Sequence, residues 1–362
     1  MKILLLGNAY WREDFEEFGH EVIAVGHDAS HDIHFRELPV SIHEVMAALP
    51  AGWAPDLILL GDDSMYPSFL GLEFMDVPLV WYAIDSHIHL SWHRTYAAAF
   101  DIILVAQKDY VASYQCDPVR QVIQWCPLFC DPQHDRYLQS PKRYDLCFVG
   151  TLNPRWNPAR VRLIEELRTR VPIHVASGDY VQPFNESRVV LNQCAANDVN
   201  FRTFQAMSCG SLLLMERVGN GLTDLFQDQK HLVLYETGNV DQIVDLTRYY
   251  GAHEGERETI AACGRALVAA SHTRRHRAEG LLALLAQHDI DRCIALRKTR
   301  LLHIQSELAL VYESAARAYG AASDRCVHGS GQWRGMRRVR ETYAFVSERI
   351  RSSLHTVQGG VA

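Results

Sequence analysis

At 362 residues, the chain is long enough for two α/β domains of ordinary size. Its content of 48% hydrophobic and 22% charged residues is typical of a globular protein and excludes a wholly disordered, collagen-like or mucin-like chain. The formal charge is −7, from 36 basic and 43 acidic side chains, so bulk charge attracts neither nucleic acid nor anionic lipid, and no nucleic-acid partner is expected.

The nine cysteines and the first residues bear on location. The odd cysteine count argues against a disulfide framework, and no second pair follows Cys126 and Cys130 at zinc-ligand spacing. The apolar run Ile3–Leu6 is too short for a signal peptide, and no segment approaches the ~20 apolar residues that cross a bilayer. We expect a cytoplasmic protein with reduced thiols.

The first half of the chain alternates short apolar runs with stretches of mixed periodicity. The runs predict buried strands at Lys2–Leu6, Glu21–Val25, Leu57–Leu60, Pro78–Ile84, Ile102–Val105 and Gln121–Leu128. Ile42–Leu49 and Trp92–Phe100 are typical of short helices. Alternating buried strands and helices predict a parallel sheet that is covered on both faces.

The polar segment Asp131–Arg143 contains two prolines and predicts a domain junction, after which the same rhythm restarts. Strands are expected at Leu146–Val149, His174–Ala176, Ser211–Met215 and His231–Tyr235, and helices after Asn157-Pro158 and near Val240–Tyr250. From about Ile260 the chain is expected to be helical. The predicted domains are residues 1–135, 143–290 and a helical extension, 291–362. Ligands of such sheets bind at the carboxyl ends of the strands.

The segment Asn200–Gly210 carries the most chemical information. Asp198 or Asn200 can cap a helix that Gly210 ends, and the N-terminus of such a helix favours an anion such as pyrophosphate. Arg202 adds a planar charge that suits phosphate oxygens, and Gln205 follows on the same face, within reach of a ribose or sugar hydroxyl. The alternative is an amphipathic helix whose core residues are Phe201, Phe204 and Met207.

Several ordered blocks resemble a known family. The segments NFRTFQAMSCG (200–210), SLLLMERV (211–218) and GLTDLFQDQKHLVLY (221–235) resemble the nucleotide-binding region of retaining group-1 glycosyltransferases, most closely the branch with the CgeB-like spore-maturation proteins. YDLCFVGT, SRVVLNQC and HTRRHRAEGLL extend the resemblance over roughly residues 144–285, with a fainter match in WYAIDSHIH (81–89). The resemblance implies the GT-B architecture: two Rossmann-like parallel-sheet domains facing a cleft, here with a helical C-terminal extension.

The resemblance also implies the donor site. Gly150 and Thr151 would approach the donor phosphates, Gly178 would border the nucleobase, and Asn200, Arg202, Thr203 and Gln205 would hold the nucleotide-sugar. A UDP-sugar is the expected donor, and no cofactor is expected. The family usually has Glu at the position of Gln205, so either the ribose is held more weakly or Glu216 takes over. The Gly150 and Gly178 turns could instead be ordinary turns.

Asp85 and His87 are the candidate catalytic residues, because they follow the predicted strand Pro78–Ile84 at its carboxyl end. Asp85 would act as the base or orient His87. Alternatively, Asp85 caps a helix that begins near Leu90, or the aspartate and the nearby histidines, which are Asp85, His87, His89 and His93, bind a metal. No metal is expected, since GT-B enzymes stabilise the leaving group with a helix dipole and basic residues. Asn8 would touch the acceptor or the sugar, or serve only a turn.

Two further patterns lie in the C-terminal half. Asp289-Ile290-Asp291 spells the metal-binding signature of another glycosyltransferase fold, but it lies between helical stretches and is interpreted as chance. Two arginine clusters predict a solvated helix face or, alternatively, docking on an anionic membrane surface or an acidic acceptor; they are Arg274, Arg275 and Arg277, and Arg334, Arg337, Arg338 and Arg340.

Together these patterns predict a transferase that moves a sugar from a nucleotide-sugar to a hydroxyl of a glycan, a lipid-linked glycan or a protein, without a metal. Peripheral membrane contact is the only membrane contact expected, and the patterns leave the oligomeric state open. A sugar-nucleotide 2-epimerase-like enzyme and an inactive nucleotide-sugar-binding or assembly protein are the alternatives.

Overall fold

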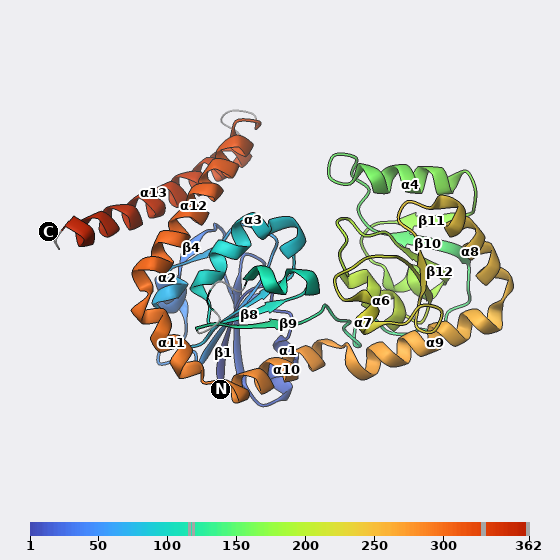
Figure 1. Ribbon diagram of the computed structural model, residues 1–362, viewed down its shortest axis with the longest axis horizontal. Coiled ribbons are helices and arrows are strands. Elements are labelled where there is room, and N and C mark those ends of the chain that lie inside the picture. Colours follow the sequence, from blue (N-terminus) through green and yellow to red (C-terminus); the bar gives the residue numbers. More distant parts are fainter. Residues whose placement is uncertain (115–116, 118–119, 327–330, 360–362) are drawn as a thin grey trace. The chain divides into compact units, whose positions relative to one another are not determined.

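The computed structural model describes residues 1–114, 117, 120–326 and 331–359, and the chain divides into two compact units (Figure 1). Unit 1 comprises Met1–Ala106, Tyr110–Cys126 and Gly280–Ala362, and unit 2 comprises Gln107–Asp109 and Pro127–Glu279. Each unit contains its own parallel sheet.

The main sheet of unit 1 has seven strands in the order β3-β2-β1-β5-β7-β8-β9, all parallel. The strands are β1 (Lys2–Gly7), β2 (Glu21–Gly26), β3 (Ile33–His34), β5 (Leu57–Gly61), β7 (Leu79–Ala83), β8 (Ile102–Val105) and β9 (Val122–Trp125), and β4 (Val40–Ser41) pairs with β6 (Phe69–Leu70) in a small second sheet. Strands β5, β7 and β8 are buried throughout, which explains their unbroken apolar sequences.

The strand order of unit 1 reverses between β1 and β5, and a ligand crevice is expected at such a switch point. The two strands approach each other closely at their carboxyl ends. A β-carbon added to Gly61 would lie 2.0 Å from the carbonyl oxygen of Asn8, so only glycine fits there. Sequence and packing thus bring Asn8 next to the end of β5.

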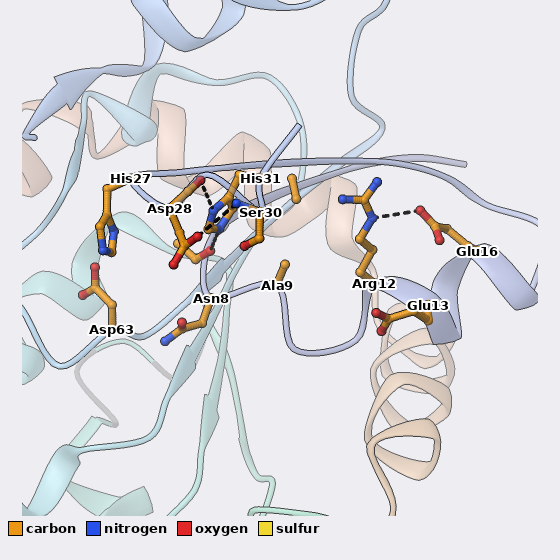
Figure 2. Close-up of a pocket in the computed structure, with 12 residues that line it drawn as sticks. Asn8, Ala9, Arg12, Glu13, Glu16, His27, Asp28, Ser30, His31 and Asp63 are labelled. Carbon is orange, nitrogen blue, oxygen red and sulfur yellow. Dashed lines mark hydrogen bonds and ion pairs between the residues drawn. The ribbon is translucent and has the colours of Figure 1, made fainter. Parts of the chain in front are cut away.

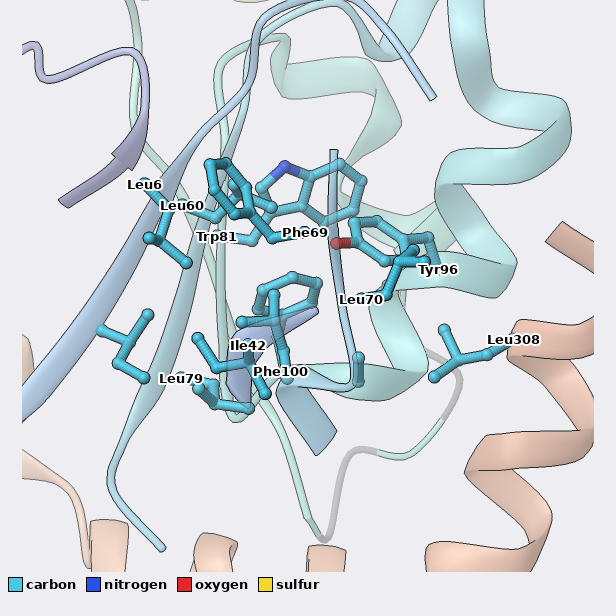
Figure 3. Packing of buried hydrophobic residues seen from close by; sticks show 14 of the residues in the cluster. Leu6, Ile42, Leu60, Phe69, Leu70, Leu79, Trp81, Tyr96, Phe100 and Leu308 are labelled. Atoms are coloured by element: carbon cyan, nitrogen blue, oxygen red, sulfur yellow. The ribbon is translucent and has the colours of Figure 1, made fainter. Parts of the chain in front are cut away.

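The α-helices described entirely within unit 1 are α1 (Arg12–Glu17), α2 (Ile42–Ala48), α3 (Ser86–Tyr96), α11 (Ile290–Thr299), α12 (Leu301–Ser323) and α13 (Gly331–Gly359). The short 3₁₀ turns are Leu72–Phe74, Ala97–Ala99 and Lys108–Tyr114. The hydrophobic core joins residues far apart in the sequence, since Leu308 of α12 belongs to the same buried cluster as Trp81 and Tyr96 (Figure 3). The C-terminal helices are therefore part of the unit 1 core.

A fully buried ion pair fastens α11 to the sheet of unit 1. Arg297 and Asp101 are both 0% exposed, and their side chains lie 3.0 Å apart. Arg297 also donates to the carbonyl oxygens of Met75 and Val77, and Asp101 accepts from the Leu79 N–H. Removing one partner would leave the other charge buried without compensation.

Unit 2 has a five-stranded parallel sheet in the order β11-β10-β12-β13-β14, with its switch point between β10 and β12. The strands are β10 (Tyr144–Val149), β11 (Ile173–Ala176), β12 (Ser187–Asn192), β13 (Leu212–Glu216) and β14 (Val233–Tyr235). The helices are α4 (Pro158–Arg168), α5 (Val181–Asn185), α6 (Phe201–Ser208), α7 (Leu222–Leu225), α8 (Val240–Ala252) and α9 (Glu254–Ser271), and α10 (Arg274–Gln287) begins in unit 2 and ends in unit 1.

The predicted fold class is confirmed, with two parallel-sheet units and a helical C-terminus. Helix α4 begins at Pro158, and the Asn157 side chain caps it by accepting from the Arg160 N–H at 3.1 Å. The last strand of unit 1 is shorter than predicted and covers Val122–Trp125. Within the described residues, the cysteines are free and no helix is long and apolar enough to cross a bilayer.

Replacing Arg297 by alanine should lower the free energy of unfolding by about 3–5 kcal/mol, because Asp101 would remain buried without a counter-charge. The matched control is Lys298→Ala, which removes the neighbouring ion pair with Asp76, where both partners are exposed; it should cost at most about 1 kcal/mol. Urea denaturation followed by circular dichroism measures both values. Equal losses in the two variants would contradict the anchoring role of Arg297.

Candidate functional site

The candidate donor site implied by the resemblance is the carboxyl edge of the unit 2 sheet, where β10 and β12 end at the switch point. Arg202, in the first turn of α6, crosses this edge. Its Nε donates to the Val149 carbonyl oxygen at the end of β10 (2.9 Å), and its Nη1 donates to the Asn192 Oδ1 at the end of β12 (2.9 Å). The guanidinium group is thus fixed to both strands by neutral acceptors.

Gly150 follows β10 and leaves room for this guanidinium group. A β-carbon at Gly150 would lie 2.5 Å from the Arg202 Nη2 and 3.0 Å from the Phe148 ring. Any larger residue would therefore displace Arg202 or the ring. The Gly150 N–H donates to the Ala176 carbonyl oxygen (2.9 Å), which holds the loop at the sheet edge.

A second arginine, Arg160 of α4, lies at the same edge. It donates through Nε to the Gln193 Oε1 (2.8 Å) and through Nη2 to the Gln193 carbonyl oxygen (3.0 Å). The guanidinium groups of Arg160 and Arg202 lie 5.5 and 4.9 Å from the centre of the Phe148 ring. In the part of the chain that the structure describes, neither arginine forms an ion pair with a carboxylate.

The pKa values of both arginines are lowered, first by burial. Burial and the neighbouring Arg160 lower the pKa of Arg202 to about 10, so it still carries its charge at neutral pH. Burial lowers the pKa of Arg160 as well. The carboxylates of Asp198 and, for Arg160, Glu216 oppose this lowering but lie beyond ion-pair distance. A bound anion would supply the direct counter-charge that these two desolvated groups lack. Arg160 is not apparent from the sequence, where its signal is its place in the first turn after the Asn157 cap.

Asn192 is fully buried and organises the start of α6. Its Nδ2 donates to the Asn200 Oδ1 (3.0 Å) and to the Thr203 hydroxyl (3.1 Å), and its Oδ1 accepts from Arg202. Asn200 occupies the N-cap position but makes no side-chain capping bond, because it is paired with Asn192. Asp198 caps the preceding turn instead, by accepting from the Ala195 N–H.

The remaining predicted donor residues differ in whether their side chains are available to hydrogen-bond with a ligand. Thr203 is completely buried and bonds to Asn192, so its hydroxyl is used within the unit. Glu216 is buried and accepts from the Cys194 N–H (2.7 Å), and burial raises its pKa. Gln205 is partly exposed, and its side chain makes no hydrogen bond within the described residues. Of the two candidates for the ribose, Gln205 therefore has the available side chain.

Thr151 and Gly178 lie on exposed loops of the same sheet edge. The Thr151 carbonyl oxygen accepts from the Arg160 Nη1 (3.4 Å), which joins this loop to the two arginines. Gly178 adopts a left-handed conformation (φ +88°) with open space around its α-carbon. No contact joins Gly178 to the Arg202 group in the described part of the chain.

Asn8 and Asp62 occupy the switch point of unit 1. The Asn8 Nδ2 donates to the Asp62 carbonyl oxygen (2.7 Å) and to the Tyr10 hydroxyl (2.8 Å). The Asp62 carboxylate accepts from the Asp85 N–H (3.2 Å) at the end of β7. The structure thereby brings Asn8 and Asp85 to one edge, joined by Asp62, which the sequence analysis did not single out.

A pocket of about 620 Å³ opens beside Asn8, at the carboxyl ends of β1 and β2 (Figure 2). Arg12 on its wall forms ion pairs with Glu16 (3.0 Å) and Asp32 (2.9 Å), and the His31 Nε2 hydrogen-bonds with the Gly7 carbonyl oxygen (2.8 Å). The residues that line it are Gly7, Asn8, Ala9, Arg12, Glu13, Glu16, Ala24, His27, Asp28, Ser30, His31 and Asp63. Its polar lining can hydrogen-bond a molecule rich in hydroxyl groups.

Asp85 is the N-cap residue of α3, which begins at Ser86 and not near Leu90, so the predicted start of this helix was wrong. The Asp85 side chain makes no capping hydrogen bond. His87 is partly exposed, and its buried Nδ1 has no hydrogen-bond partner among the described residues. His93 is fully buried. No group of three His, Cys, Asp or Glu side chains that could hold a metal ion occurs in the described part of the chain.

The first arginine cluster has a structural role. Arg274 pairs with Asp131 (3.3 Å), and Arg277 donates to the carbonyl oxygens of Pro127 and Leu128; both arginines are buried. In the second cluster, Arg337 pairs with Glu341 and Arg338 with Glu37. Asp289 of the D-x-D sequence caps α11 by accepting from the Arg292 N–H (3.0 Å).

Residues 133–283 match a protein family described as glycosyl transferase-like. The predicted enzyme class, a glycosyltransferase, is confirmed by this match. The matched segment contains the whole sheet edge with Arg160, Asn192 and Arg202. No curated protein sequence matches the chain.

Several solved structures share the fold. The Anabaena protein HepE in complex with UDP-glucose has a TM-score of 0.55 and 11% identity, over 80% of this chain and 100% of that chain. A glycosyltransferase from Rickettsia africae has a TM-score of 0.59 and 10% identity (78% and 97% covered), and sucrose-phosphate synthase from Thermosynechococcus elongatus has 0.56 and 12% (79% and 98%). At such identities the likeness shows the fold, which is GT-B.

Replacing Asn192 by leucine should lower the free energy of unfolding by at least about 2 kcal/mol, because Asn200 and Thr203 would lose buried hydrogen-bond partners. The control is Asn239→Ala, which removes an exposed cap of α8 and should cost about 1 kcal/mol. Urea denaturation gives both values. A smaller loss for Asn192→Leu than for the control would contradict the organising role of Asn192.

Proposed function

We propose that the protein transfers a sugar from a nucleotide-sugar, expected to be a UDP-sugar, to a hydroxyl of a glycan, a lipid-linked glycan or a protein. Unit 2 binds the donor and unit 1 receives the acceptor. The transfer needs no metal, because arginines stabilise the leaving diphosphate. We further propose that the protein acts in the cytoplasm and belongs to the branch with the CgeB-like proteins, as the resemblance of residues 144–285 implies.

The observation that carries this proposal is the pair Arg160 and Arg202. Both guanidinium groups lie at the switch point of the unit 2 sheet, are partly or largely desolvated, and lack carboxylate partners among the described residues. A diphosphate would supply the missing negative charge. Gly150 leaves the Arg202 Nη2 unobstructed, since a β-carbon there would lie 2.5 Å from this nitrogen.

We base the assignment of the nucleoside on analogy with HepE and on the availability of the Gln205 side chain for hydrogen bonding. HepE was solved with UDP-glucose and with UDP, which favours a uridine nucleotide for this chain too. Gln205 lies three residues after Arg202 on the same helix, and its amide can both donate to and accept from a ribose hydroxyl. Gly178 borders the base in this proposal.

The acceptor hydroxyl attacks the anomeric carbon of the sugar while the bond from that carbon to the phosphate oxygen breaks. The diphosphate leaves with the bonding electrons, and Arg160 and Arg202 stabilise its additional charge. The hydroxyl proton passes to Asp85, directly or with His87 oriented by it. Asn8 and the adjoining pocket bind other hydroxyl groups of the acceptor.

Arg202→Ala should weaken UDP binding by at least about 1.5 kcal/mol, or roughly tenfold, because one charged hydrogen bond is lost. Arg160→Ala should have an effect of the same order. Isothermal titration calorimetry measures both affinities, and Arg162→Ala is the control, since this arginine of α4 is exposed and has no partner among the described residues. Wild-type affinity in both variants would remove the arginine pair from the donor site.

Asp85→Asn should abolish transfer and leave donor affinity unchanged, since the amide cannot accept the proton and the donor residues lie in unit 2. The donor is first chosen by a thermal-shift screen of UDP-, GDP-, dTDP-, CMP- and ADP-sugars. Released UDP or the corresponding nucleotide is then measured with and without acceptor. A fully active variant would show that Asp85 has only a structural role at the start of α3. Nucleotide binding by the wild type without transfer or hydrolysis would favour a binding or assembly protein.

A further inference from the structure

Asp62 is the most deeply buried acidic group at the carboxyl edge of the unit 1 sheet. It follows β5 at the switch point and is 4% exposed. Its carboxylate accepts three backbone N–H groups: from Ser64 at Oδ1 (2.8 Å), and from Ile84 (3.0 Å) and Asp85 (3.2 Å) at Oδ2. One side chain thus connects the end of β5 to the end of β7.

The three bonds lead to the candidate catalytic turn. The Asp85 carbonyl oxygen accepts from the N–H groups of Ile88 and His89, so the position of Asp85 sets the first turn of α3. Ser64 is held in a left-handed conformation (φ 62°) that is costly for a residue with a β-carbon, and its hydroxyl hydrogen-bonds with the His89 Nε2 (3.0 Å). Both ends of the Asp62 carboxylate therefore act on the Asp85–His89 turn.

We propose that Asp62 is a positioning residue, whose carboxylate holds the Asp85–His89 turn in the geometry that sugar transfer requires. This inference rests on the proposed function. A carboxylate is the side chain that suits the place, because each of its oxygens accepts hydrogen bonds from backbone N–H groups. The amide of asparagine would direct its own N–H₂ group at one of these donors and leave at least one N–H without an acceptor.

Protonation of Asp62 would have a similar effect. Burial first, and then the nearby carboxylate of Asp85, raise the pKa of Asp62 to about 7, against the backbone N–H bonds that lower it. The other titratable groups that interact with it are Tyr10, Asp63, Tyr96, Tyr114 and His93. The His93 Nε2 lies 3.8 Å from the Asp62 Oδ2, and burial holds the pKa of His93 well below its usual value. The carboxylate form, which holds the turn, is therefore gained as pH rises through about 7.

The test compares Asp62→Asn with Asp56→Asn in the full chain. The control removes the same kind of bond, from the Lys2 N–H to the Asp56 Oδ2 (2.7 Å), at the opposite end of β5. Hydrogen–deuterium exchange of residues 84–90 should become at least about tenfold faster in Asp62→Asn, the effect of losing a hydrogen bond to a charged group, and stay unchanged in the control. The turnover number should fall at least about tenfold with the donor KM unchanged, since donor residues lie in unit 2.

The pH profile distinguishes positioning from general stability. Wild-type turnover should increase as pH rises through about 7, and Asp62→Asn should lack this increase. If Asp62→Asn does not fold, wild-type exchange of residues 84–90, corrected for the intrinsic pH effect, should be faster at pH 6 than at pH 8. Unchanged exchange in these measurements, or wild-type turnover in a folded Asp62→Asn, overturns the proposal. If the wild type turns over no donor, the proposed function fails, and the exchange results still decide whether Asp62 holds the turn.

Discussion

The guanidinium group of Arg202 is held in a largely desolvated place by two neutral oxygens, from Val149 and Asn192, and the proposed donor site depends on this arrangement. A carboxylate at either position would satisfy the charge and leave nothing for a ligand to neutralise. The parallel sheet makes the arrangement possible, because adjacent strands end at the same edge, where the oxygens of Val149 and Asn192 can accept hydrogen bonds from one side chain. This arrangement requires Gly150, which leaves space for the guanidinium group. It also requires the buried Asn192 amide, which aligns α6 so that Arg202 reaches the edge of the sheet.

In unit 1, buried charges are stabilised in two ways, by backbone N–H groups and by an ion pair. Asp62 is surrounded by backbone N–H donors, whereas Arg297 and Asp101 neutralise each other at a place where no ligand is needed. A charge that has an internal counter-ion serves the fold, and a charge that is held only by dipoles remains responsive to a ligand or to pH. By this criterion we assign Arg202, Arg160 and Asp62 to the proposed function, while Arg297 and Arg274 belong to structure.

Sequence patterns predicted the alternating elements, the Asn157 cap and the place of Arg202 in the first turn of α6, because each depends on residues close together in the chain. Arg160 and Asp62 were missed, because their significance comes from long-range packing. Arg160 meets Arg202 across the Phe148 ring, and Asp62 meets Asp85 between two strands that are neighbours only in the folded sheet. The start of α3 was placed too late for the same kind of reason: Asp62 holds the N–H groups of Ile84 and Asp85 from another strand, and the Asp85 side chain makes no capping hydrogen bond.

The ion pair between Arg297 and Asp101 also has a consequence for the order in which the chain folds during synthesis. Asp101 is made early, but its counter-charge and the α12 residues of the same core emerge from the ribosome only after all of unit 2. Unit 2 is almost contiguous, from Pro127 to Glu279, and has all its strands available before Arg297 is made. The second unit in the sequence is thus the first that can be completed, and the N-terminal unit must wait, with part of its core exposed, for the last helices of the chain.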